Sequence, residues 1–195
     1  MYQDAFLTFP ILETERLTLR KLNENDAEAM SEYLQDPVFL CFTDYPTHFE
    51  IPDVIKIWNN EAYNPQGMIR WCIWCIALKE NNRCIGNIYL FDPQCDDISG
   101  RRMNIGYEIS TQHRNNGYAT EVIKRVVVFG LEQMGLKRVQ AQIIPENIAS
   151  IKACEKSGFK NEGTLRNYCH YQFSNILRTM VMMSYIPLDL NIGDI

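Results

Sequence analysis

The chain has 195 residues, of which 46% are hydrophobic and 22% are charged, and its formal net charge is −5. This length and composition are typical of one soluble globular domain over residues 1–195, long enough to bury a substantial core. The acidic balance argues against nucleic acid as a partner, because a nucleic-acid-binding protein needs a broad basic face.

The N-terminal part of the chain predicts a strand followed by a helix. Residues 1–14 look like an irregular lead-in, and Glu15–Leu22 alternates apolar and polar residues, as a half-buried strand does. Asn23 is able to cap a helix over Asp26–Gln35. That helix is expected to end before Pro37, because proline disfavours helical backbone angles in the residue that precedes it.

The middle of the chain predicts one helix and three strands. The helix covers Pro52–Asn60, since proline suits the first turn of a helix. The strands are Arg70–Leu78, Cys84–Phe91 and Arg101–Ser110. Asp92–Gly100 is expected to form a polar loop between the last two strands.

The C-terminal part adds two helices and three strands. Ala119–Met134 places its apolar residues three and four apart, as a one-sided helix does. A strand over Arg138–Ile144 and a helix over Asn147–Ser157 follow. The closing strands, Phe159–Leu165 and Ile176–Ile186, are joined by a polar loop with aromatic residues. This order predicts an α+β fold around one mixed sheet.

No segment approaches the roughly 20 apolar residues that span a bilayer, so no membrane partner is expected. The N-terminus has no basic region before a long apolar run, which argues against a signal peptide. Seven cysteines without a secretion signal indicate free thiols in a reducing compartment. The expected location is therefore the cytoplasm.

The cysteine and histidine patterns predict no metal site. Cys72 and Cys75 form a C-x-x-C, but residues three apart on a strand point to opposite faces, so core packing is the better interpretation. His48, His113 and His170 lie far apart, with no ligand-like spacing.

The most informative segment is Gln112–Glu121, a short polar turn between the strand-like run Met103–Ser110 and the long helix. The first four N–H groups of a helix have no partner inside the helix, and the helix dipole is positive at that end. A phosphate group fits such a turn. The segment therefore predicts a phosphorylated ligand held beside a strand.

Several short motifs resemble those of the GNAT N-acetyltransferases. The pattern R/Q-x-x-G-x-G/A, which opens the main helix in that family, is matched by R-N-N-G-Y-A. The resemblance also includes N-x-x-S, E-K-x-G-F, an E-G-T-L-R ending, and a first strand like that of the branch that acetylates ribosomal-protein N-termini. In chain order the matching segments are Glu15–Arg20, Arg114–Ala119, Asn147–Ser150, Glu155–Phe159 and Glu162–Arg166.

The resemblance covers about residues 14–186. It implies a single N-acetyltransferase domain with a three-layer α/β/α fold. The sheet is expected to be mixed, mainly antiparallel and twisted, with about seven strands and four helices. The resemblance also implies acetyl-CoA as donor and no metal.

The implied acetyl-CoA site has two parts. Backbone N–H groups would hold the pyrophosphate, and the pantetheine arm would run along Ile109 and Ser110 and accept a hydrogen bond from Asn147. Many relatives have glycine or a basic residue at two loop positions that are asparagine here, but asparagine tolerates left-handed backbone angles. The loop residues are Arg114, Asn115, Asn116, Gly117, Tyr118, Ala119 and Thr120.

The resemblance also suggests catalytic residues. Glu108 is the candidate base that deprotonates the amine through water, and its alternative is a solvated glutamate beside Tyr107. Ser150 and Tyr168 compete as the acid that protonates the leaving thiolate. For Ser150, the alternative is a serine in the first turn of a helix whose hydroxyl is satisfied by the backbone. For Tyr168, which is expected in the final loop, the alternative is a side chain that forms a wall of the pocket. The backbone N–H near Ile109 would polarise the thioester carbonyl.

The acceptor stays open at the level of sequence. Acceptor specificity in this family comes from the counterparts of residues 24–65 and 166–178, and Thr179 stands where the ribosomal-protein branch usually has aspartate. The resemblance implies a primary amine, either a protein N-terminus or a small molecule. The alternatives are detoxification of an antibiotic or polyamine, and a non-catalytic acetyl-CoA-binding module. Homodimers are common in the family, but the sequence does not reveal the oligomeric state.

Overall fold

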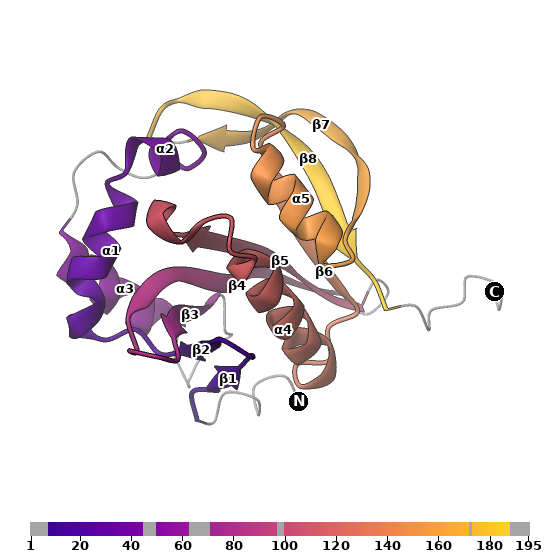
Figure 1. The fold of residues 1–195 in the computed structure, drawn as a ribbon. Helices are drawn as coiled ribbons and strands as arrows, with labels where there is room; N and C mark the ends of the chain where they lie inside the picture. Colours follow the sequence, from indigo (N-terminus) through magenta and orange to yellow (C-terminus); the bar gives the residue numbers. More distant parts are fainter. Residues whose placement is uncertain (1–7, 45–49, 63–70, 97–99, 172, 188–195) are drawn as a thin grey trace.

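The computed structural model describes residues 8–44, 50–62, 71–96, 100–171 and 173–187. Within these residues an eight-stranded sheet runs in the order β1-β2-β3-β4-β5-β6-β8-β7 (Figure 1). Only the β5–β6 pair is parallel among the neighbouring strands of this sheet. The predicted α+β class and the mixed, mainly antiparallel sheet are confirmed, with eight strands in place of about seven.

The strands and helices follow the predicted order. Four described helices have at least eight residues, as expected, and none is long and apolar enough to cross a bilayer. The strands are β1 Leu12–Glu13, β2 Leu17–Arg20, β3 Trp71–Leu78, β4 Cys84–Asp96, β5 Gly100–Ile109, β6 Arg138–Ile143, β7 Lys160–Tyr171 and β8 Ile176–Tyr185. The helices are α1 Ala27–Leu34, α2 Pro37–Leu40, α3 Ile51–Ala62, α4 Tyr118–Glu132 and α5 Ile148–Lys156.

The predicted cap at Asn23 is present. Its side chain accepts a hydrogen bond from the N–H of Asn25, and Asp26 Oδ2 accepts one from the N–H of Asn23 at 2.9 Å. These reciprocal bonds start a 3₁₀ turn, Glu24–Asp26, that continues into α1. The helix ends at Leu34, and the chain begins the one-turn helix α2 at Pro37, which the sequence did not predict.

A hydrophobic core covers each face of the sheet. One core packs β-strand residues against α4 and α5, and the other packs them against α1 and α3. Cys72 belongs to the first core and Cys75 to the second, which confirms that the two side chains point to opposite faces of β3. The structure is therefore the expected three-layer α/β/α arrangement (Figure 1).

Three further segments differ from the sequence-based expectation. The lead-in contains the short strand β1, and the strand β4 continues through most of the expected loop, to Asp96. Asp92 has φ 53° at a shift in the β4–β5 register, so this turn-favouring residue forms a bulge and does not end the strand. β7 extends to Tyr171, because an exposed edge strand accommodates polar residues.

The sheet opens between its two parallel strands. β5 pairs with β6 only at three positions, from Arg102 with Arg138 to Asn104 with Gln140. Beyond these pairs, β5 pairs with β4 alone, while β6 pairs with β8. Among the described strands, the side of β5 that would face β6 has no partner from Ile105 to Ile109. The backbone oxygen of Ile109 accepts a hydrogen bond from Arg114 Nε at 3.1 Å, and the other backbone groups on this side are able to pair with a ligand.

A matched pair of valines on α4 tests how this helix is packed. Val126 is fully buried and Val128 is 42% exposed. Val126→Ala should lower the free energy of unfolding by about 2 kcal/mol, because buried methyl groups are removed and a cavity remains. Val128→Ala should change it by less than about 0.5 kcal/mol. Urea unfolding followed by circular dichroism measures both, and equal losses would contradict the assigned orientation of α4.

Candidate functional site

A tight turn connects the end of β5 to the start of α4. Asn115 has φ 64° and Gly117 has φ 80°, so both adopt the left-handed conformation that allows the chain to reverse. The expected tolerance of asparagine at this turn is confirmed at Asn115. Gly117 is the N-cap of α4, and no side chain caps this helix end. Its first N–H groups therefore have no partner within the helix.

Arg16 links this turn to the N-terminal part of the sheet through hydrogen bonds. Its guanidinium donates to the backbone oxygen of Asn116 at 2.9 Å and to Glu121 Oε2 at 2.8 Å. The same guanidinium lies over the ring of Tyr118, 4.5 Å from its centroid. The N–H of Arg16 also donates to Glu121 Oε1 at 3.0 Å. The turn is thus held by a residue about a hundred positions earlier in the chain.

A second group of polar side chains crosses the opening between β5 and α5. The hydroxyl of Tyr107, on β5, lies 2.7 Å from Ser150 Oγ on α5 and 3.2 Å from the Ser150 carbonyl oxygen. Asn147 caps α5 by accepting a hydrogen bond from the N–H of Ser150 at 3.1 Å. No described residue accepts a hydrogen bond from the side-chain amide of Asn147. Burial raises the pKa of Tyr107, so its hydroxyl stays protonated.

Glu108 is buried, with 6% of its surface exposed. Burial raises the pKa of Glu108 from 4.5 to about 8, and a hydrogen bond from Tyr89 opposes part of that rise. The Tyr89 hydroxyl donates to Glu108 Oε1 at 2.9 Å, while Oε2 has no hydrogen-bond partner among the described residues. The alternative of a solvated glutamate is therefore wrong.

A second buried oxygen lies near Glu108. Asn87 stands opposite Glu108 in the β4–β5 register, and its amide nitrogen donates to the Tyr33 hydroxyl at 2.6 Å. Its Oδ1 is buried and has no partner among the described residues. Two neighbouring residues thus each present an unsatisfied acceptor, and a buried acceptor without a donor is costly.

Two glycines, Gly86 and Gly106, permit the close packing of Tyr89 and Glu108. A Cβ atom at Gly106 would lie 2.5 Å from the ring of Tyr89, and one at Gly86 would lie 2.0 Å from the backbone oxygen of Glu108. The absence of a side chain at position 106 lets Tyr89 lie across β5 and reach Glu108.

The candidate acid and the candidate base lie on opposite faces of β5. Successive strand residues alternate between faces, and Tyr107 packs against the core beneath α4 and α5. The partner of Glu108, Tyr89, packs against the core beneath α1 and α3. The structure therefore brings together Asn147, Ser150 and Tyr107 on one face, and places Glu108 on the other.

Tyr168 lies in strand β7, not in a loop as expected, and 51% of its surface is exposed. No hydrogen bond joins it to Ser150 or Glu108 among the described residues. The acid role requires a group close to the thiol of the cofactor. Ser150 and Tyr107 form a hydrogen-bonded pair, and Tyr168 is not joined to it.

The tip of the β7–β8 hairpin rests on the segment after α2. Asp44 accepts hydrogen bonds from the N–H groups of Phe173 and Ser174, both at 3.3 Å. The hydroxyl of Tyr171 donates to the backbone oxygen of Phe42 at 3.3 Å. α2 and the hairpin thus meet beyond the ends of β4 and β5 (Figure 1). The two regions expected to form the acceptor site are in contact.

The aromatic residues of the expected acceptor region divide between core and surface. Tyr33 and Phe39 are buried and pack edge to face, so they belong to the core. Residues 45–49, which end the aromatic cluster, lie outside the described residues. Thr179, in place of the usual aspartate, accepts a hydrogen bond from the N–H of Asn167 at 3.3 Å. It therefore helps to hold the β7–β8 hairpin.

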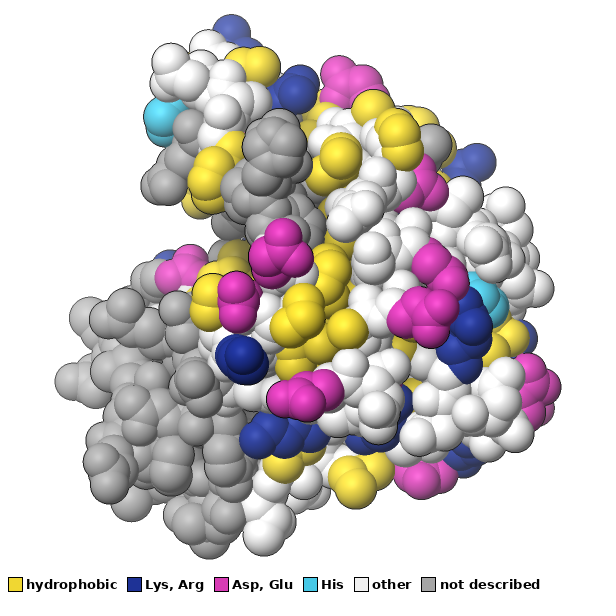
Figure 2. All heavy atoms as spheres, turned by 90° about the vertical axis from the view of Figure 1, so that its left-hand side faces the viewer, with side chains coloured by type: hydrophobic (Ala, Val, Ile, Leu, Met, Phe, Trp, Pro, Cys, Tyr) yellow, Lys and Arg dark blue, Asp and Glu magenta, His cyan; other side chains and the backbone are white. Residues whose placement is uncertain are grey.

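The surface beside α1 is hollow and acidic. An open depression of about 580 Å³ is lined by Glu28, Ser31, Glu32, Gln35 and Asp36. Asp36 also accepts a hydrogen bond from the hydroxyl of Thr111, which directly follows β5 and Ser110. Figure 2 shows hydrophobic side chains in the recessed middle of this side of the molecule, with acidic side chains around them.

Sequence reasoning missed Tyr89, Asn87, Tyr107 and Arg16 as parts of the site. The alternation of β5 was sufficient to place Tyr107 and Glu108 on opposite faces. The partners of Glu108 come from β4, and their identity depends on the β4–β5 register, which no local pattern in the chain indicates.

Comparison with known proteins agrees with this arrangement. The family model for the acetyltransferase (GNAT) domain matches residues 16–160. The uncharacterized N-acetyltransferase YoaA of Bacillus subtilis (strain 168) is 37% identical over 172 residues, covering 83% of this chain and 89% of the relative.

Solved structures share the fold at low sequence identity. Mycobacterium smegmatis RimJ in complex with CoA-disulfide has a TM-score of 0.78 at 19% identity, covering 94% of this chain and 90% of that chain. Spermidine N-acetyltransferase from Vibrio cholerae in complex with CoA and spermine has a TM-score of 0.70 at 16% identity, covering 87% and 95%. Since the family match runs from the residue before β2 to the first residue of β7, this chain belongs to the GNAT family of N-acetyltransferases.

Proposed function

We propose that the protein transfers an acetyl group from acetyl-CoA to a cationic primary amine, by direct attack within a ternary complex. The observation that carries this proposal is the open side of β5. It has an uncapped helix N-terminus at one end, a Tyr107–Ser150 pair on one face and a buried Glu108 on the other. A thioester lying along β5 would place its carbonyl carbon between these two faces.

The turn before α4 suits the pyrophosphate of acetyl-CoA. Backbone N–H groups of residues 114–120 and the positive end of the α4 dipole would bind the phosphates. The arm of the cofactor would pair with Ile109 and Ser110, and the free amide of Asn147 would donate to it. The CoA complexes of the related structures support this placement.

Glu108 would act as the general base. An amine must lose a proton before it attacks, and a carboxylate with a pKa of about 8 is matched to that task near neutral pH. The unsatisfied oxygens of Glu108 and Asn87 would accept hydrogen bonds from the amine or from a water between them. The ammonium proton would pass to Glu108 before the nitrogen–carbon bond forms.

Ser150 would protonate the leaving sulfur from the other face. If Tyr107 donates its proton to Ser150 Oγ, the Ser150 hydroxyl hydrogen is directed toward the opening. Burial raises the pKa of Tyr107, so the phenol keeps a proton that it is able to donate. Tyr168 is the second candidate for this role.

The acidic surroundings favour a positively charged acceptor. The depression along α1 carries Glu28, Glu32 and Asp36 at four-residue intervals, and it ends beside Thr111 at the end of β5. A negative groove concentrates cationic ligands and guides them to the site. Polyamines and basic peptide N-termini both meet this description.

A panel of acceptors tests the proposal. Thiol release from acetyl-CoA should be fastest with polyamines or with peptides that have a free N-terminus and nearby basic residues. N-terminally blocked peptides should be inert. Tight binding of acetyl-CoA without turnover on any amine would instead favour the non-catalytic module.

Gly117 and Gly135 provide a matched test of the acetyl-CoA site, because they lie at opposite ends of α4 with φ values of 80° and 69°. Alanine at either position strains the backbone by about 1–2 kcal/mol. Only Gly117→Ala should weaken acetyl-CoA binding, by about tenfold or more, because its Cβ stands where the phosphate would approach. Isothermal titration measures both affinities, and equal weakening would contradict this position for the phosphates.

Glu108→Gln tests the base. In the wild type kcat/KM should rise with pH as Glu108 loses its proton near pH 8. The variant should lose about 10²–10⁴-fold in kcat/KM and also lose that rise. Tyr89→Phe removes a hydrogen bond that lowers the pKa of Glu108, so the rise should move to higher pH. An unchanged profile in Glu108→Gln would assign the rise to the amine and remove Glu108 from the mechanism.

The same carboxyl should influence stability. The unfolded chain releases the Glu108 proton near pH 4.5, while the folded protein retains it up to about pH 8. Rising pH across this window therefore favours the unfolded chain, and Glu108→Gln abolishes this effect. Relative to wild type, the variant should gain at least about 1 kcal/mol in unfolding free energy between these pH values. Urea unfolding at both pH values checks this, and a gain that is independent of pH would contradict it.

A further inference from the structure

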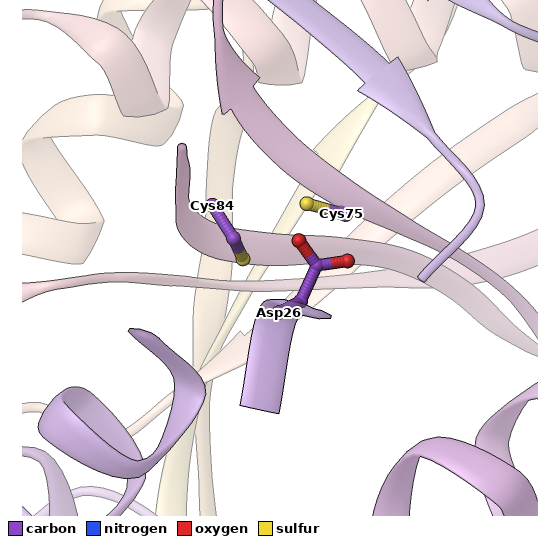
Figure 3. Close-up of side chains that lie close together, drawn as sticks. All are labelled: Asp26, Cys75 and Cys84. Atoms are coloured by element: carbon purple, nitrogen blue, oxygen red, sulfur yellow. The ribbon is translucent and has the colours of Figure 1, made fainter. Parts of the chain in front are cut away.

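Three potential metal ligands converge beneath α1, on the face of the sheet that also carries Glu108. The Sγ atoms of Cys75 and Cys84 and a carboxylate oxygen of Asp26 all lie within 4.8 Å of one another. Figure 3 shows the three side chains pointing toward one another from the start of α1, from β3 and from β4. All three residues are buried, with exposures of 3% or less. We propose that Asp26, Cys75 and Cys84 bind a divalent, thiolate-preferring metal ion of the zinc type.

The spacing of the sulfurs fits a shared ion better than a disulfide. Cys84 stands opposite Ala77, two residues along β3 from Cys75, so the two cysteines are diagonal neighbours on one face. Diagonal neighbours have Cα atoms about 7–8 Å apart, beyond the usual span of a disulfide. Two sulfurs bound to one tetrahedral zinc ion lie about 3.8 Å apart. A small inward movement of the side chains would meet this distance.

The charges favour a divalent ion. Asp26 forms a bidentate pair with Arg20, whose Nη1 and Nη2 lie 2.8 Å from the two carboxylate oxygens. Binding would replace both thiol protons by the metal: two thiols and M²⁺ give a metal dithiolate and two protons. The thiolates balance the ion, and Arg20 balances Asp26, so the buried site stays neutral.

The residues around the cluster hold the carboxylate of Asp26 in place and leave space for a fourth ligand. Arg20 also donates to the side chain and the backbone oxygen of Asn82, and these bonds hold the guanidinium in place. A fixed outer partner of this kind orients a ligating carboxylate. A cavity of about 180 Å³, lined by Asp26, Cys84, Asn82 and other polar residues, opens beside the cluster. This cavity provides an entry path and space for a water molecule as fourth ligand.

Such an ion would join the first turn of α1 to the β3–β4 hairpin. Neither the spacing of Cys72 and Cys75 nor the histidines indicated this cluster, because its members meet only after β3 and β4 pair. Cys75 stands opposite Asn87 in the β3–β4 register, so the test is read by metal binding and not by activity.

Cobalt titration tests the proposal on the full-length, reduced and chelator-treated protein. Co²⁺ should produce a near-ultraviolet thiolate-to-cobalt absorption band that zinc abolishes by displacement. Cys75→Ser and Cys84→Ser should lose most of the band. Cys72→Ser is the matched control, a buried cysteine on the opposite face of the same strand, and should keep it. No band in the folded wild type, or an undiminished band in Cys84→Ser, would overturn the proposal.

A second measurement covers variants that fold poorly. Zinc should raise the unfolding temperature of the wild type and of Cys72→Ser, because it binds only the folded state. In the wild type, zinc should slow the alkylation of Cys75 and Cys84 relative to that of Cys72. Mass spectrometry of peptides measures the alkylation of each cysteine. Equal alkylation rates with and without zinc at Cys75 and Cys84 would also overturn the proposal.

Discussion

The separation of β5 from β6 is the constraint on which the rest of the structure depends. The two strands pair at only three positions, and from there β5 carries backbone groups that no described strand satisfies. Buried backbone groups require partners, so this opening is costly unless a ligand pairs with it. The turn before α4, the cap of α5 and Glu108 all lie along this opening. The candidate site is therefore a consequence of how the sheet is divided.

The divided sheet also explains why the polar side chains of the site occupy two environments. On the face beneath α4 and α5, Tyr107 and Ser150 satisfy each other. On the other face, Glu108 has one satisfied and one unsatisfied oxygen in a buried setting. Burial in such a setting raises the pKa of the carboxyl. Gly86 and Gly106 make this setting possible, since any side chain there would collide with Glu108 or Tyr89.

Much of this fold was predictable from local patterns, and the failures share one cause. Apolar periodicity located α4, and the asparagine cap and following proline located α1, because these signals act within one element. The burial of Glu108 was not predictable, since it depends on Tyr89 from the neighbouring strand. The extension of β4 past Asp92 likewise depends on pairing with β5. The register between neighbouring strands is not predictable from local sequence patterns.

The contact of Arg16 with the turn before α4 has a consequence for how the protein responds to its ligand. Arg16 precedes β2, on the far side of the sheet order from β6, yet it holds the backbone of Asn116 and the side chain of Glu121. A ligand that orders this turn would also restrain Arg16 and the strand that follows it. Amide hydrogen exchange in β2 would then slow on binding, because Arg16 couples this strand to the turn. The N-terminal edge of the sheet would thus report the occupancy of the turn before α4.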